Sequence, residues 1–354
     1  MIYFILLFIS LLILLKKPNK YSSIGSIIFI FLLLLIGGFR DITIGTDTEW
    51  YFHNWFFTTF KPTSWNHYTP FEPGFNYFIA FFKEYISSSY TAFYSTVFFI
   101  TYLFPIIFIK RLKLNYGIYF ALCYITFHYG ASLNIMRQYL ALNICFLILV
   151  IAWKEKHNLI LYEFLICAVA ILLHKSMFML CIFPLFDQKK IQSFLSTKIL
   201  IIFLFLATGI SILGKSFLES KLDIFLGVFG SRADDYISSF IKYGLYDRSI
   251  GYAGQFLNTL FLILISRGRR NGYFYCGIFG LYIYIITASF MPVIGRLALN
   301  YSFLMFIYLV QNWFEFKKNK TTYYLSLAIL LYYVYSLYYT LLINTTYNPY
   351  NFYF

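Results

Sequence analysis

The chain has 354 residues, of which 60% are hydrophobic and 12% charged, and its mean hydropathy is +0.70. A soluble domain of this size cannot bury so much apolar surface, because surface area falls too slowly with mass. We therefore expect an all-α polytopic membrane protein. The five cysteines lie inside apolar runs without paired spacing, so we expect neither disulfides nor a metal site.

The net charge of +14 would suggest a nucleic-acid partner in a soluble protein. Here more than half of the 28 lysines and arginines lie in six clusters, and the chain between successive clusters can cross a bilayer twice. Because such basic loops face the cytoplasm, the charge predicts membrane orientation, and we expect no nucleic-acid partner. The clusters are Lys16-Lys17-Lys20, Lys110-Arg111-Lys113, Lys154-Lys156, Lys189-Lys190-Lys198, Arg267-Arg269-Arg270 and Lys317-Lys318-Lys320.

The apolar runs predict about twelve transmembrane helices in a single integral membrane domain over residues 1–354. Two long outer loops, at about 39–87 and 215–250, would contain interfacial helices. Every inner connection is short, and no phosphate-binding glycine loop is present, so an enzyme of this kind would use neither ATP nor cytosolic nucleotide sugars. The expected crossings are 2–15, 22–38, 88–109, 115–131, 134–153, 158–173, 175–187, 198–214, 251–266, 273–290, 296–313 and 321–343.

The first outer loop concentrates charge and glycine between Gly37 and Tyr51, with an arginine and three carboxylates. Thr46-Asp47-Thr48-Glu49 has the spacing of a capping box and predicts an amphipathic, aromatic helix from about Thr48. In this interpretation Glu49 is a helix cap, and Asp47 either faces the first amides of the helix or serves a site. A second apolar segment begins at Pro70–Gly74 and ends at Lys83-Glu84.

Hairpin lengths predict four cationic positions at a similar depth near the outer surface. One turn falls near Leu133-Asn134, with Arg137 just inside the returning helix, and a short hairpin places His174-Lys175 at its apex. Arg296 follows the Met291-Pro292 turn, and Arg40 lies at the mouth of the second crossing. Ionisable groups at such depth are costly unless they are paired or used. Alternatively, each arginine extends to the headgroups, and His174 is a hydrogen-bonded core residue.

With these positions laid out, the chain resembles the EpsG-like branch of the Wzy-type polysaccharide polymerases. The similarity covers nearly the whole length, in the same order. The residues that carry it are Arg40-Asp41, Gly45-Thr46-Asp47, Tyr51, Phe71-Glu72-Pro73-Gly74-Phe75, Ile135-Met136-Arg137-Gln138-Tyr139-Leu140-Ala141, His174-Lys175-Ser176, Arg296 and Asn348-Pro349-Tyr350.

The resemblance implies a bacterial inner-membrane glycosyltransferase that acts on the periplasmic side. Such an enzyme transfers a growing glycan from undecaprenyl diphosphate to another lipid-linked repeat unit, for O-antigen or exopolysaccharide synthesis. Its partners would be these lipid-linked oligosaccharides and a chain-length regulator in the inner membrane. A lipid diphosphate leaving group also agrees with the absence of nucleotide motifs and with several outer cations, since arginine matches phosphate oxygens bidentately.

We predict that Arg40, Arg137, Arg296 and Lys175 bind the diphosphate. The general base would be Asp47, His174 or Glu72, of which Asp47 is preferred because it lies in a glycine-bounded loop beside Arg40. We expect no cofactor and no metal ion.

Three other functions fit parts of the pattern. A flippase for the same lipids would place its charges at the bilayer midplane and show related halves. An O-antigen ligase would share the donor but use a lipid-core acceptor. A membrane acyltransferase using His174 would take its donor from the cytoplasmic side, where the sequence offers no candidate group.

Overall fold

The computed structural model describes residues 2–16, 24–41, 44–45, 48–57, 71–220, 249–287 and 292–343. Every secondary-structure element in these ranges is a helix. The prediction of an all-α chain is therefore confirmed. The contacts divide the chain into two compact units, Met1–Cys181 with Tyr333–Phe354, and Ile182–Tyr332. The prediction of a single membrane domain stays a prediction, and each unit is described by itself.

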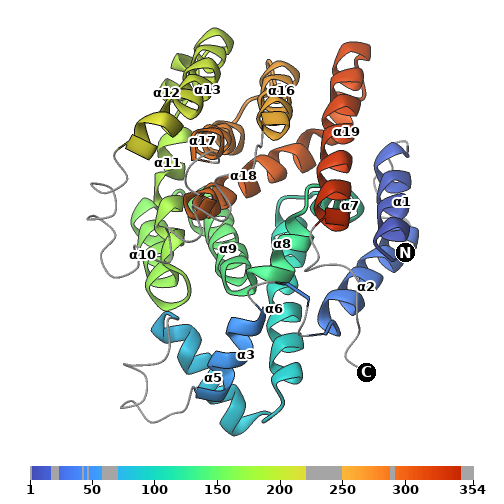
Figure 1. Cartoon of the computed structure of the whole chain (residues 1–354), viewed down its shortest axis with the longest axis vertical. Helices are drawn as coiled ribbons and strands as arrows, with labels where there is room; N and C mark the ends of the chain where they lie inside the picture. The colour runs from blue at the N-terminus through green and yellow to red at the C-terminus, as the bar shows by residue number, and fades with distance from the viewer. Residues whose placement is uncertain are drawn as a thin grey trace. The chain divides into compact units, whose positions relative to one another are not determined.

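The first unit contains helices α1 to α10 and the end of α19, coloured blue to green and red in Figure 1. Its bounds are α1 Ile2–Leu15, α2 Ile24–Gly38, α3 Thr48–Phe57, α5 Pro73–Tyr85, α6 Tyr90–Arg111, α7 Tyr116–Ile125, α8 His128–Asn134, α9 Met136–Ile148, the π-helix η2 Leu149–Glu155, α10 Leu159–Leu172 and the 3₁₀-helix η3 Lys175–Ile182.

Two helices of the described chain, Tyr90–Arg111 and Met136–Glu155, are long and apolar enough to cross a membrane. They pack against each other, and Arg111 at the end of the first pairs with Glu155 at the end of the second at 2.7 Å. The two helices therefore run antiparallel, with Tyr90 and Met136 at the opposite end from this ion pair. Shorter apolar helices lie in eight of the other predicted crossings, and none of them, in the part of the chain that the structure describes, falls in 296–313 or 321–343. The count of twelve stays a prediction.

Polar side chains define where several of these helices begin. Ser89 accepts a hydrogen bond from the backbone nitrogen of Ala92 at the start of α6, at 3.3 Å. Asn115 and Asn158 do the same at the starts of α7 and α10, at 3.1 and 2.9 Å. Each side chain satisfies one of the amides that a first helical turn leaves without a partner.

One predicted crossing, 115–131, is wrong in detail, because two helices occupy it. Phe127, which separates α7 from α8, has a φ of 64°. This left-handed conformation is costly for a residue with a side chain and cannot continue an α-helix. The break redirects α8 so that it ends at Asn134, directly before α9 begins.

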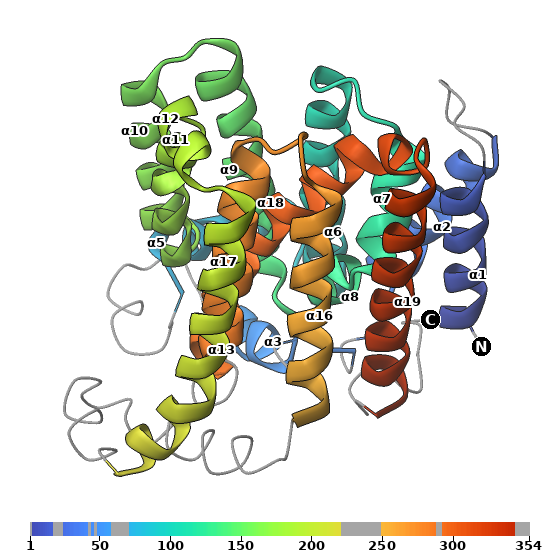
Figure 2. The same cartoon turned by 90° about the horizontal axis from the view of Figure 1, so that it is seen from above.

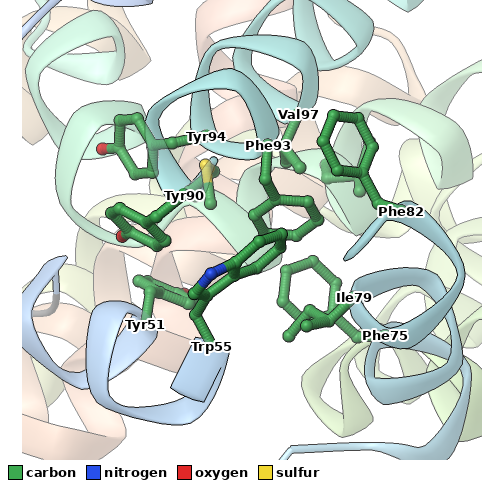
Figure 3. Packing of buried hydrophobic residues seen from close by; sticks show 11 residues of the cluster. Tyr51, Trp55, Phe75, Ile79, Phe82, Tyr90, Phe93, Tyr94 and Val97 are labelled. Atoms are coloured by element: carbon green, nitrogen blue, oxygen red, sulfur yellow. The ribbon is translucent and has the colours of Figure 1, made fainter. Parts of the chain in front are cut away.

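An aromatic cluster joins α3, α5, α6 and α9 (Figure 3). The ring of Phe93 is its centre, with centroids 5.0 Å from Trp55, 5.4 Å from Phe82 and 5.5 Å from Phe78. The tilted and edge-to-face geometries are those that aromatic pairs prefer. Because Tyr51 and Trp55 of α3 are buried here while His53 is exposed, the predicted amphipathic helix from Thr48 is confirmed.

The second apolar segment of the predicted first outer loop forms helix α5. Its first turn lies so close to α10 that a Cβ on Gly74 would come within 2.6 Å of the carbonyl oxygen of Leu172. Near the other end, Lys83 donates to the carbonyl oxygen of Trp55 at 2.9 Å. Partial burial there lowers the pKa of Lys83.

The second unit consists of α11 Phe183–Phe186, α12 Lys189–Phe194, α13 Thr197–Ser220, α16 Ser249–Ile265, α17 Gly272–Thr287, α18 Pro292–Phe316 and most of α19 Lys320–Ile343. Figure 2 shows α17 beside α18, which it contacts along its length. Gly277 and Gly280 permit this approach, since a Cβ on either would fall within 2.6 Å of Met305 or Tyr301. The second predicted outer loop, 215–250, lies largely outside the described residues.

We predict that Phe93→Ala lowers the free energy of unfolding by about 3–5 kcal/mol, because it opens a cavity at the centre of the aromatic cluster. Thermal unfolding in detergent micelles measures the effect. The matched control is Phe164→Ala on α10, where the ring is 68% exposed. Equal losses in both variants would show that the cluster does not hold these helices together.

Candidate functional site

Glu72 is the residue at which three distant segments of the first unit meet. It precedes α5 at the N-cap position, but its carboxylate does not cap that helix. Instead, Oε2 accepts a hydrogen bond from Nη1 of Arg137, and Oε1 accepts one from the backbone nitrogen of Lys175 at 3.0 Å. Both carboxylate oxygens are thus engaged, and the side chain is 8% exposed.

Arg137 lies in the first turn of α9, and its guanidinium is fixed from two sides. Glu72 binds one terminal nitrogen, and the ring of Phe71 lies 4.3 Å from the guanidinium carbon. The side chain is 13% exposed, and its Nε is buried without a hydrogen-bond partner among the described residues. A planar cation held in this way keeps N–H donors for a further acceptor, and a buried donor without a partner is unfavourable until one arrives.

The backbone of the same region is tied to α3. The hydroxyl of Tyr51 accepts a hydrogen bond from the backbone nitrogen of Arg137 at 3.3 Å, and its ring lies 5.2 Å from that of Phe71. A helix beginning leaves amide donors without intrahelical partners, and Tyr51 satisfies one of them. The two aromatic residues therefore fix where α9 begins as well as where its arginine lies.

His174 and Lys175 lie in the turn between α10 and η3, at the apex that hairpin length predicts. Nδ1 of His174 is 2.7 Å from the Ser176 hydroxyl and accepts from the Ser176 backbone nitrogen at 3.3 Å. A neutral ring that accepts at Nδ1 carries its proton on Nε2, so in this arrangement His174 is a donor from Nε2. The Lys175 side chain is exposed, while its backbone is held by Glu72.

Arg40 makes a different set of contacts. It is 1% exposed, and it donates to the carbonyl oxygens of Gly37, at 3.0 Å, and of Leu133. Its guanidinium carbon lies 4.1 Å from the centre of the Tyr94 ring, and the Tyr94 hydroxyl donates to the same Leu133 oxygen at 2.9 Å. Arg40 therefore joins the C-terminal ends of α2 and α8, where cations interact favourably with helix dipoles.

The structure thus brings together Glu72, Arg137 and the backbone of Lys175, and it places Arg40 beside the α8 end that precedes α9. Asp47 and Glu49 cannot be compared, because Asp47 and the side chain of Glu49 lie outside the described residues. The same holds for the side chain of Arg296, although its backbone lies in α18. In the described ranges, no three His, Cys, Asp or Glu residues lie close enough to hold a metal ion.

Tyr94 helps to hold Arg40 and the end of α8 in place, a role that the sequence analysis did not predict. It lies four residues after Tyr90 in the first turns of α6, so both rings project from one face of the helix. Tyr90 donates to the carbonyl oxygen of Thr48 at 3.3 Å, as Tyr94 does to that of Leu133. The i, i+4 tyrosine pair at the start of a long apolar run was the available indication.

Comparison with known families bears on what such a site does. The sequence matches the model of the EpsG family over residues 23–352, nearly the whole chain. The chain belongs to the EpsG family. No curated protein and no solved structure matches it. This EpsG chain is accordingly a polysaccharide-polymerase-like membrane protein with a helical fold.

We predict that Arg40→Met destabilises this EpsG protein by about 1–3 kcal/mol, because the Gly37 carbonyl oxygen loses the arginine donor and that of Leu133 keeps only the Tyr94 hydroxyl. Arg111→Met, which removes a cation whose side chain is 42% exposed, should shift the unfolding temperature less. Circular dichroism during heating in detergent compares the two. A larger shift for Arg111→Met would contradict the structural role of Arg40.

Proposed function

We propose that the protein is a metal-independent glycosyltransferase that joins undecaprenyl-diphosphate-linked repeat units on the periplasmic face of the bacterial inner membrane. Its product would be an O-antigen or an exopolysaccharide. The observation that carries the proposal is the guanidinium of Arg137, held by Glu72 and Phe71 with N–H groups left for an anion. Family membership supports the reaction class.

The position of Arg137 along its helix supports a lipid-linked substrate. The helix Met136–Glu155 has 20 residues, so it rises about 30 Å, close to the thickness of the hydrocarbon core. Arg137 lies in its first turn, and the exposed Arg111–Glu155 pair marks the other end. Arg137 would therefore lie at one membrane surface, at the level where a polyprenyl diphosphate has its charges.

The local charges also suit a diphosphate. Glu72 neutralises one of the two neighbouring cations, Arg137 and Lys175, so the three side chains together carry one net positive charge. In our proposal Arg137 binds the phosphate oxygens through its remaining N–H groups, because its planar fork matches them bidentately. Lys175 contributes further positive charge, and Arg40 holds the helix ends that position Arg137, while a part for Arg296 stays a prediction from the sequence.

The reaction would be a direct displacement at the anomeric carbon of the donor sugar. The acceptor hydroxyl oxygen forms the new glycosidic bond as the bond from that carbon to the diphosphate oxygen breaks, and the electron pair leaves with the diphosphate. Arg137 stabilises the departing charge. The hydroxyl proton passes to a base, for which we propose Asp47.

The contacts of the other two candidate bases favour different roles. Both oxygens of Glu72 already accept hydrogen bonds, so we assign it the positioning of Arg137. Nδ1 of His174 already accepts from the Ser176 backbone nitrogen, so Nδ1 is not available as the base.

We predict that Arg137→Met abolishes polymerisation and that Arg137→Lys retains a small fraction, because a lysine supplies charge without the fork. The measurement is surface glycan from a deletion strain complemented with each variant. Single repeat units should accumulate on the lipid core. Absence of all repeats in the deletion strain would indicate a flippase or a ligase instead, and normal chain lengths in Arg137→Met would exclude the proposed site.

We predict that Glu72→Gln lowers the turnover number about tenfold to hundredfold, since it releases Arg137 while keeping the shape of the side chain. A double-mutant cycle with Arg137→Lys separates the roles of Glu72. A positioning residue should lose most of its effect once Arg137 is changed. Additive losses, with a pH profile altered by Glu72→Gln alone, would identify Glu72 as the base.

A further inference from the structure

Helix α5 is apolar on two opposite faces yet too short to span a membrane. Its 13 residues rise about 20 Å, against the roughly 30 Å of a hydrocarbon core. One face, with Phe75, Ile79 and Phe82, is buried in the aromatic cluster. A short apolar helix that cannot span belongs either in a protein core or at the membrane interface.

The opposite face of α5 is exposed. Tyr77, Phe81 and Tyr85, spaced four residues apart, are 51%, 47% and 66% exposed, and the last two rings lie 5.3 Å apart. We call these three residues the outer face of α5. Residues with this spacing share one side of a helix, so the three form a continuous stripe. A core position is excluded for this stripe.

The contacts of α5 place it across the ends of the long helices. Its Gly74 meets Leu172, the last residue of α10, and its Phe75, Phe78 and Phe82 all lie within 6.1 Å of Phe93, in the first turn of α6. If α5 ran alongside α6, it would contact residues from successive turns of α6. Its three phenylalanines instead contact the single ring of Phe93, so α5 crosses the start of α6. Figure 1 shows α5 in this place beside the start of α6.

We propose that the outer face of α5 lies in the lipid–water interface and binds the headgroup and glycerol region of phospholipids. Tyrosine rings suit this layer because they are apolar bodies with one polar end, and Tyr77 and Tyr85 flank the wholly apolar Phe81. Ile171 and Leu172 at the end of α10, which contacts the first turn of α5, are also 55% and 47% exposed. Aliphatic side chains suit lipid and favour it over a glycan as the occupant.

The placement fixes the depth of the candidate site. Glu72 directly precedes α5, so an interfacial α5 holds Glu72 and Arg137 at the level of the lipid phosphates. This last step rests on the proposed function, whereas the lipid contact of α5 does not.

The test uses p-benzoylphenylalanine, a photocrosslinking residue, introduced singly at the positions of Phe81 and Lys318 in the otherwise unchanged full chain. Phe81 is on the outer face, and Lys318 is a polar position, 68% exposed, in the turn before α19. Each protein is reconstituted in vesicles of phosphatidylethanolamine and phosphatidylglycerol, irradiated, and analysed by mass spectrometry for phospholipid adducts. The adduct yield does not depend on polymerase activity. A negative result would therefore overturn the lipid contact without bearing on the proposed function.

We expect at least a fivefold higher yield of phospholipid adducts at position 81 than at position 318. A nitroxide on Phe81→Cys, in a chain whose native cysteines are replaced by serine, gives a second reading. It should collide with oxygen and be shielded from a water-soluble nickel chelate. Equal adduct yields, free access of the chelate to position 81, or crosslinks to added lipid-free oligosaccharide in place of phospholipid would overturn the proposal.

Discussion

The arrangement of the first unit depends on the carboxylate of Glu72. Its two oxygens join the start of α5 to the start of α9 and to the turn after α10, segments that lie 65 and 103 residues away in the sequence. The pair with Arg137 is largely buried, and removing one partner of such a pair leaves an uncompensated charge that costs about 3–5 kcal/mol. Because separating the pair is so unfavourable, Glu72 keeps the starts of α5 and α9 and the turn after α10 together, with the guanidinium of Arg137 among them.

A second arginine performs the complementary task at the neighbouring helix ends. Arg40 packs against the ring of Tyr94 and donates hydrogen bonds to carbonyl oxygens in the last turns of α2 and α8. Arg137, by contrast, forms an ion pair with Glu72 alone among the described residues. It lies in the first turn of a helix that is long enough to cross a membrane. Two residues that look equivalent in sequence thus divide into one that positions helices and one that is available to an anion.

Much of this could be predicted from the sequence. Hairpin lengths located the turn at Leu133-Asn134 and the apex at His174, because helix length and membrane thickness constrain both. The break at Phe127 and the burial of Arg40 could not be predicted, since each depends on tertiary packing. The acceptor of Arg40 is a backbone oxygen 93 residues away, and no local pattern marks it. The role of Glu72 was equally hidden, because a carboxylate before a helix ordinarily suggests a cap or a base.

Binding of undecaprenyl diphosphate to the detergent-solubilised protein, followed by native mass spectrometry, tests the central claim most directly. Arg137→Met should weaken binding about tenfold to hundredfold, the loss of a hydrogen-bonded charge at a phosphate. Arg111→Met, which removes an arginine from the opposite end of the same helix pair, should leave binding unchanged. Equal affinity in wild type and Arg137→Met would contradict the assignment of the diphosphate site to Arg137.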